Sequence, residues 1–181
     1  IGNISRLGAI KKAVVSMEKG VASFEKQVER VKKQGVVIPD DVAENLKKAR
    51  TLVNTIKSAK TWDEVENAGF YEFDDIMDKL NNSRQELEYL AKWPTVMKEV
   101  DKQIAKLELA LKNTKSKVDS LEKKGIDTSF NYMKFEEDIS NLKNVKTEAT
   151  SVMKEGNGEE AFEMLENNFF DNLDNVYENQ R

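Results

Sequence analysis

Apolar residues recur along the first thirty residues with the period of a long amphipathic helix. From Leu7 onward they are spaced alternately three and four residues apart, at Leu7, Ile10, Val14, Met17, Val21, Phe24, Val28 and Val31. This spacing places the apolar side chains on one face of a helix, as in a coiled-coil heptad. Lysine and glutamate occupy most positions between them. The pattern therefore predicts one long helix that packs along a single side.

The same pattern returns 90 residues later. The second stripe consists of Met97, Val100, Ile104, Leu107, Leu111, Thr114, Val118 and Leu121, in which only Thr114 is polar. Both stripes end in lysines followed by a glycine, Gly35 in the first and Gly125 in the second. Lysine complements the carbonyl end of a helix, and glycine adopts the left-handed conformation that ends it. We infer a tandem duplication that includes the helix ends.

A second helix is predicted in each copy. In the first copy Pro39 and Asp40 are typical of a helix start, and the apolar stripe that follows is Val42, Leu46, Ala49, Val53 and Ile56. In the second copy the helix can be capped at its N-terminus by the side chain of Asp127, Thr128 or Ser129. The stripe behind them is Phe135, Ile139, Leu142, Ala149 and Val152, with Val145 out of register.

A third helix is predicted after short breaks at residues 61–63 and 156–158. Beyond these breaks residues 75–82 match residues 168–175, at an offset of 93 instead of 90. The second copy therefore contains a three-residue insertion, which we expect in a turn. Between the copies, Pro94 lacks a backbone N–H, so it either starts a new helix at its first turn or kinks one continuous helix. We favour a break, with one helix ending and another beginning there.

The predicted fold class is all-α: an antiparallel helical bundle or coiled coil of about six helices, formed by tandem duplication of a three-helix unit. The units are expected at residues 1–92 and 93–181. They could form a rod or a compact six-helix body, and the rod is favoured. A radius of gyration near ~16 Å in small-angle scattering would indicate the compact body.

The charges divide between the helices. Residues 1–60 hold 13 Lys or Arg and 6 Asp or Glu, and residues 61–93 hold 3 and 9. Residues 94–154 hold 12 and 10, and residues 155–181 hold 1 and 8. The third helix of each copy is therefore acidic and favours pairing with its more basic neighbours. Because the basic helices have acidic neighbours, the uncompensated positive face that binds nucleic acid is not expected.

The composition excludes several kinds of site. Cysteine and histidine are absent, which removes thiol nucleophiles, Ser-His arrangements and the usual zinc and di-iron ligands. The acidic residues Asp74, Asp75 and Asp78, like the runs 136–138 and 159–160, are interpreted as solvated helix faces. We therefore predict no catalytic residue, no metal site and no cofactor. No apolar run reaches the ~20 residues of a membrane-spanning helix.

The candidate contact residues are aromatic or lie where the two copies join. They are Tyr89, Trp93, Pro94 and Tyr177, which we predict to contact a partner or the other unit. The expected partner is a protein, and a monomer is favoured. An alternative is that the first stripe pairs between molecules, which sedimentation and replacement of Val21 and Phe24 by Asp would test. Because the chain begins with Ile1 instead of Met, we expect a processed mature form or an excised piece of a longer polypeptide. The first of these favours an extracytoplasmic location.

Each copy has the same order of elements: a long helix ending in Lys-Lys-x-Gly or Lys-Lys-Gly, a capped helix, and an acidic helix, which in the second copy ends at residues 171–177. This order resembles that of uncharacterised tandem helical-repeat proteins of uncultured bacterial lineages. In general layout it also resembles spectrin-type repeats. The resemblance carries no known activity. The leading hypothesis is a non-enzymatic structural or protein-interaction module. The alternative is a ligand-binding or sensor bundle, with a cavity lined by Thr114, Trp62 or the aromatic residues of the third helices.

Overall fold

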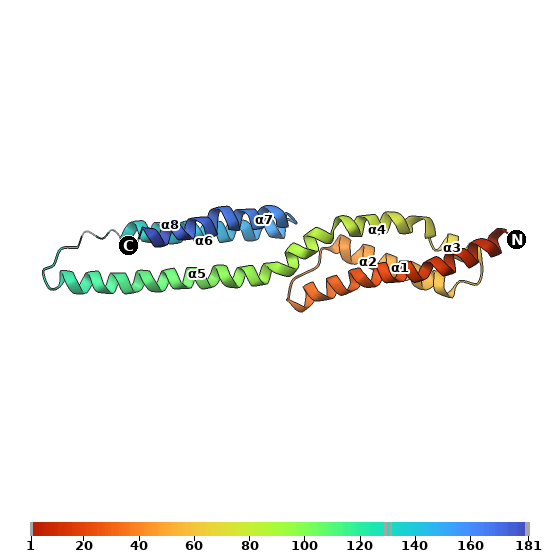
Figure 1. The fold of residues 1–181 in the computed structure, drawn as a ribbon, viewed down its shortest axis with the longest axis horizontal. Coiled ribbons are helices and arrows are strands. Elements are labelled where there is room, and N and C mark those ends of the chain that lie inside the picture. The colour runs from red at the N-terminus through yellow and green to blue at the C-terminus, as the bar shows by residue number, and fades with distance from the viewer. Residues whose placement is uncertain (1, 129, 131, 180–181) are drawn as a thin grey trace. The chain divides into compact units, whose positions relative to one another are not determined.

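A computed structural model describes residues 2–128, 130 and 132–179, and every regular element in these residues is a helix (Figure 1). The predicted all-α class is confirmed. The chain divides into two compact units, Ile1–Ala91 (unit 1) and Lys92–Arg181 (unit 2). The division falls one residue before the expected position.

Unit 1 is built from two long helices and a broken third segment. Its elements are α1 (Gly2–Lys33), α2 (Asp40–Ser58), α3 (Trp62–Asn67), the 3-10 turn η1 (Phe70–Glu72), α4 (Phe73–Asn82) and the beginning of α5 (Arg84–Glu122). α2 packs against both α1 and α4 (Figure 1). The helix start predicted at Pro39 is present, since Pro39 directly precedes α2 and its carbonyl accepts a hydrogen bond from the Ala43 N–H at 3.1 Å.

The first stripe forms the core of unit 1. Six of its members are buried, namely Ile10, Val14, Val21, Phe24, Val28 and Val31, while Leu7 and Met17 are half-buried. The guanidinium of Arg84 lies 4.2 Å from the centre of the Phe24 ring. Facing side chains from α2 are also buried, including Leu46, Val53 and Ile56. Most of the stripe is thus covered within its own unit.

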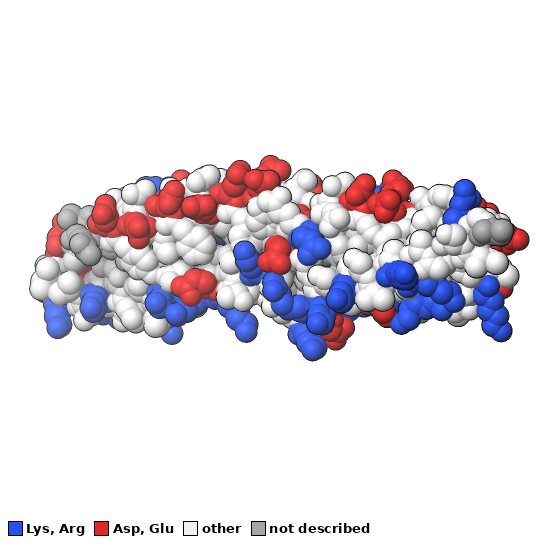
Figure 2. Space-filling model, turned by 45° about the vertical axis from the view of Figure 1, so that its right-hand side comes forward, with Lys and Arg blue, Asp and Glu red and all other residues white. Residues whose placement is uncertain are grey.

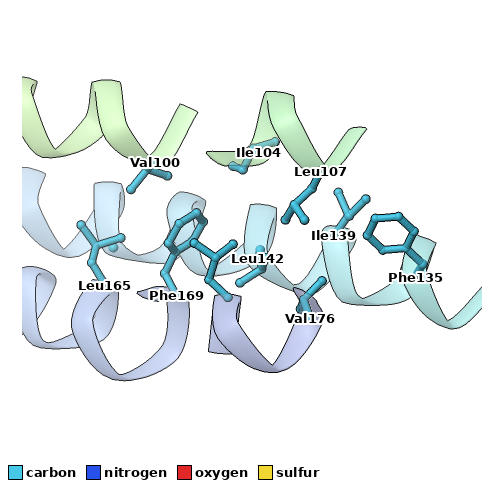
Figure 3. Packing of buried hydrophobic residues seen from close by; sticks show 11 residues of the cluster. Val100, Ile104, Leu107, Phe135, Ile139, Leu142, Leu165, Phe169 and Val176 are labelled. Carbon is cyan, nitrogen blue, oxygen red and sulfur yellow. The ribbon is translucent and has the colours of Figure 1, made fainter. Parts of the chain in front are cut away.

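Unit 2 combines the rest of α5 with α6 (Tyr132–Lys154), α7 (Gly158–Met164), the π-helical turn η2 (Leu165–Phe170) and α8 (Asp171–Glu178). Its core draws side chains from three layers (Figure 3). They are Val100, Ile104 and Leu107 of α5, Phe135, Ile139 and Leu142 of α6, and Leu165, Phe169 and Val176 of the third segment. No side chain classed as buried is polar or charged in the described part of the chain.

Two positions of the predicted stripes in unit 2 are wrong. Leu121 is 36% exposed. The ammonium of Lys115 on α5 lies 5.3 Å from the ring of Tyr132, the first residue of α6. Leu121 lies six residues further along α5, past the start of α6, so α6 does not cover it. On α6 the last buried side chain of the stripe is that of Met153, four residues after Ala149, and not that of Val152 as predicted. Ser129, predicted to cap this helix, lies outside the described residues.

The predicted helix break at Pro94 is also wrong, because Pro94 lies inside α5. A proline in a helix interior loses one hydrogen bond and crowds the preceding turn, at a cost of about 3 kcal/mol. Packing of the neighbouring residues offsets this cost. Trp93, Val96 and Met97 all pack against the core of unit 2.

The π-helical turn in unit 2 follows from the spacing of its apolar residues. Ala161, Leu165, Phe169 and Leu173 are all buried and lie four residues apart three times in succession. An α-helix has 3.6 residues per turn, so such a stripe would drift around it by roughly 120° over these three steps. A wider turn between Leu165 and Phe170 keeps the four side chains on the core side.

Candidate binding groove

A groove of about 840 Å³ lies in unit 1, between α2 and the segment α3–η1–α4. Its apolar side chains are Leu52, Ala68 and Ile76. The polar residues that line it on α2 are Glu44, Lys47, Lys48, Thr51, Thr55 and Ser58, and those on the opposite side are Glu64, Asn67 and Glu72. Its volume falls within the range of about 300–1,000 Å³ found for ligand sites in proteins.

The groove exists because the third segment of unit 1 is broken. Two backbone hydrogen bonds close the C-terminal end of α3. The N–H of Ala68 donates to the Glu64 carbonyl at 3.2 Å, and the N–H of Gly69 donates to the Glu66 carbonyl at 3.0 Å. Gly69 has φ +83°, in the left-handed region that glycine adopts without a Cβ penalty. The chain then turns through η1 before α4 begins. A single continuous third helix, as expected from the sequence, is therefore not formed in unit 1.

The start of α3 is held by Thr61 and Glu64. The Thr61 hydroxyl accepts a hydrogen bond from the Glu64 N–H at 3.3 Å. In return, the Glu64 carboxylate accepts one from the Lys60 N–H at 2.8 Å. This is close to a capping box, in which a threonine and a glutamate three residues later satisfy the free N–H groups of a helix start. The cap also fixes the Glu64 carboxylate at the rim of the groove.

Replacing Thr61 with Ala should lower the free energy of unfolding by about 1 kcal/mol, because the cap is lost. Urea unfolding followed by circular dichroism measures this change. Thr147→Ala is the matched control, since Thr147 lies inside α6 and bonds only to the carbonyl of Lys143. There alanine has the higher helix propensity. Equal destabilisation by the two replacements would contradict a capping role for Thr61.

Carboxylates dominate the third-segment side of the groove. Residues 61–83 contain seven Asp or Glu and one Lys. That single Lys79 pairs with Asp75 at 2.9 Å. On the α2 side, Lys48 pairs with Glu44 at 2.7 Å, and this bond, with a smaller contribution from Glu72, raises the pKa of Lys48. The charge of Lys48 is therefore already compensated by protein carboxylates.

A second groove, of about 600 Å³, lies between α5 and α6 in unit 2. Three lysines line it, Lys143, Lys146 and Lys154, together with Ile104 and several hydroxyl groups. Lys146 pairs with Asp101, and Lys143 with Glu108. Since two of its three cations are used to join α5 to α6, this groove is less suited to an anionic ligand than its composition indicates.

The candidate contact residues from the sequence do not line either groove. In unit 2, the Trp93 ring packs edge-on against Phe162, with centroids 5.6 Å apart. Tyr177 donates a hydrogen bond from its hydroxyl to the Gln103 side-chain oxygen at 3.2 Å. In unit 1, Tyr89 accepts one from Gln85 at 3.2 Å. Pro94 is half-buried in α5. Trp93 and Tyr177 thus help to pack unit 2.

The acidic residues that could have held a metal ion are spread along exposed helix faces. Asp74, Asp75 and Asp78 are exposed, and within the described residues no group of three or more potential ligands is arranged to hold a metal. In the same part of the chain, no helix combines the length and the apolar character that crossing a membrane requires.

Comparison with models of known protein families, with curated proteins and with solved structures found no match. The resemblance to bacterial helical-repeat proteins stays a hypothesis.

Proposed function

We propose that the chain is a non-enzymatic structural or protein-interaction module that presents an acidic helical face to a basic partner. The observation that carries this proposal is the charge of the third segment of unit 2. Residues 158–179 contain seven Asp or Glu and no Lys or Arg. Figure 2 shows acidic side chains gathered on one side of this unit.

The acidic face lacks the pairing that the other two helices of unit 2 possess. α5 and α6 are joined by ion pairs, among them Lys146–Asp101 and Lys115–Glu136. Over the described residues, no carboxylate of α7, η2 or α8 has a cation within ion-pair distance. A face of one charge sign attracts a partner of the opposite sign and speeds its association.

The test removes charge from this face without changing its shape. The variant replaces three exposed glutamates of α7 by glutamine, Glu159, Glu160 and Glu163. The matched control replaces three exposed glutamates of α5 and α6, Glu122, Glu137 and Glu148. A basic protein captured by the unmodified chain should be lost by the first variant and kept by the second. Titration of that protein in purified form should show the same order and weaken with added salt.

Two results would contradict the proposal. One is equal affinity of the purified partner for the variant and the control, which would remove the acidic face from the interaction. The other is binding that does not change with salt, because attraction between exposed charges is screened at high ionic strength.

A ligand-binding or sensor bundle is the second candidate, and the groove of unit 1 favours it. The cavity for this function was expected around Thr114, Trp62 or the third-helix aromatics. Instead the groove is lined by the hydroxyl and charged side chains of α2 and by Glu64 and Glu72. Thr114 bonds to the carbonyl of Ala110 in its own helix at 2.8 Å. The groove therefore supports this candidate at a different place.

We also propose that the two units are copies of one ancestral unit. An ion pair between the first two helices supports this, because Glu18–Arg50 in unit 1 and Glu108–Lys143 in unit 2 stand at offsets of 90 and 93. The connection between α1 and α2 spans residues 34–39, and that between α5 and α6 spans residues 123–131. The second is three residues longer, which accounts for the change of offset by an insertion in a turn.

A further inference from the structure

The groove of unit 1 has a carboxylate on its third-segment side, at a position where the sequence of unit 2 has an apolar residue. At the offset of 93, Ile76 corresponds to Phe169 and Leu80 to Leu173, and all four are buried. The same offset pairs Glu72 with Leu165. Leu165 is 1% exposed, whereas Glu72 is exposed and lines the groove. Beside Glu72, unit 1 packs the apolar Phe73 into its core at 8% exposure, so the carboxylate stays outside the core at the edge of the groove.

The length of the groove suits a helix. Its lining along α2 runs from Glu44 to Ser58, about 21 Å at 1.5 Å per residue. Thr51, Thr55 and Ser58 follow one another at the spacing of a helix face, and their side chains are short. Short side chains along a face allow a neighbouring helix to approach closely. A helix of about 14 residues would match this length.

The chemistry of the lining selects the kind of helix. Leu52, Ala68 and Ile76 offer apolar contact at the base, and Glu64 and Glu72 carry charge at the third-segment rim. On the opposite rim Lys48 is paired with Glu44 and Lys47 adds one positive charge, so the lining holds three carboxylates and two lysines. An amphipathic helix with aliphatic residues on one face and lysine or arginine beside them complements both features.

We propose that the groove between α2 and the segment α3–η1–α4 binds a basic amphipathic helix of a partner protein. The partner's aliphatic side chains contact Leu52, Ala68 and Ile76. Its cations face Glu64 and Glu72. This goes beyond the acidic face of unit 2 and rests on the same premise, that the chain binds a basic protein.

The test uses a fluorescein-labelled 15-residue peptide of Leu and Lys, with Leu at alternate spacings of three and four, and a second peptide with Glu in place of Lys. Fluorescence anisotropy with the full chain should show saturable binding of the Lys peptide with one site per chain, and at least about tenfold weaker binding of the Glu peptide. Failure of the Lys peptide to bind, or equal binding of both peptides, would overturn the proposal.

Two variants with matched controls place the peptide in the groove. Glu72→Lys should weaken binding about tenfold, whereas Asp78→Lys, the same charge change outside the groove, should leave it within about twofold. Thr51→Trp should fill the groove and reduce binding at least about tenfold, whereas Asn54→Trp on the same helix should not. All four positions are exposed, and circular dichroism checks the fold of each variant.

The same titration separates this proposal from the acidic face of unit 2. The variant with glutamine at Glu159, Glu160 and Glu163 should bind the Lys peptide as the unmodified chain does. If this variant loses the peptide while Glu72→Lys and Thr51→Trp keep it, the groove proposal is wrong and the acidic face remains. Equal weakening by Glu72→Lys and Asp78→Lys would also overturn it, because it would indicate diffuse attraction.

Discussion

Replacing Val21 and Phe24 together with Asp is expected to unfold unit 1. Both side chains are almost fully buried, Val21 at 0% and Phe24 at 1% exposure. Removing a buried phenylalanine side chain alone costs about 3–5 kcal/mol. Burying two carboxylates without matched partners adds several kcal/mol for each, so the total cost is comparable with the stability of about 5–15 kcal/mol typical of a whole domain. Circular dichroism should show a large loss of helix at 25 °C.

The control for this variant uses the same chemistry on the outer face of the same helix. Ile4 is 78% exposed and Val15 is 55% exposed, so the double replacement of these two by Asp should leave the helix content and the unfolding transition nearly unchanged. Sedimentation gives the decisive comparison. If the Val21 and Phe24 variant stayed folded while the unmodified chain sedimented as an oligomer, the stripe would pair between molecules and the fold described above would be wrong.

The long helices could be predicted from the sequence because one physical rule governs them. Residues at alternate spacings of three and four share a helix face, and burial of that face is the dominant favourable term in folding. Val14, Val28 and Val31 are buried as this rule requires. The rule states which face is apolar but not how far the facing helix extends. Leu121 was therefore expected in the core and is exposed.

The break at Pro94 was predicted wrongly because a local preference was given too much weight. Proline disfavours a helix interior, but packing of Trp93 and its neighbours on unit 2 offsets a local cost of this size. The candidate contact residues were placed at the junction on a different ground, because they are aromatic or lie where the two copies join.

The groove was missed, although two local signals for it are present in the sequence. Thr61 with Glu64 three residues later indicates a helix start, and Gly69 soon afterwards indicates a stop. Read together, they predict a short helix and a turn where one long third helix was expected. Which face the turn leaves open depends on the packing of α2 against α4, and no local pattern specifies that.

The π-helical turn leads to a second large effect, a difference between two single-residue deletions. Removing a residue from a helix rotates everything beyond it by about 100°. In the π-helical turn this rotation cancels part of the drift that the four-residue spacing of the buried side chains would cause in an α-helix. Deleting the exposed Asn167 brings Leu165 and Phe169 three residues apart, so that the buried series from Ala161 to Val176 follows the alternate spacing of four and three. An ordinary α-helix then suffices to keep these side chains in the core.

Deleting the exposed Asn144 from α6 has the opposite consequence, because this helix is regular throughout. The deletion turns Ala149 and Met153 away from the core relative to Leu142, at a cost of about 3 kcal/mol or more. Urea unfolding should therefore place the Asn167 deletion within about 1 kcal/mol of the unmodified chain, and the Asn144 deletion far below it. Similar losses from the two deletions would show that the wider turn is not set by the spacing of Leu165, Phe169 and Leu173. That spacing is visible in the sequence, so the same test decides whether a π-helical turn can be predicted from apolar periodicity alone.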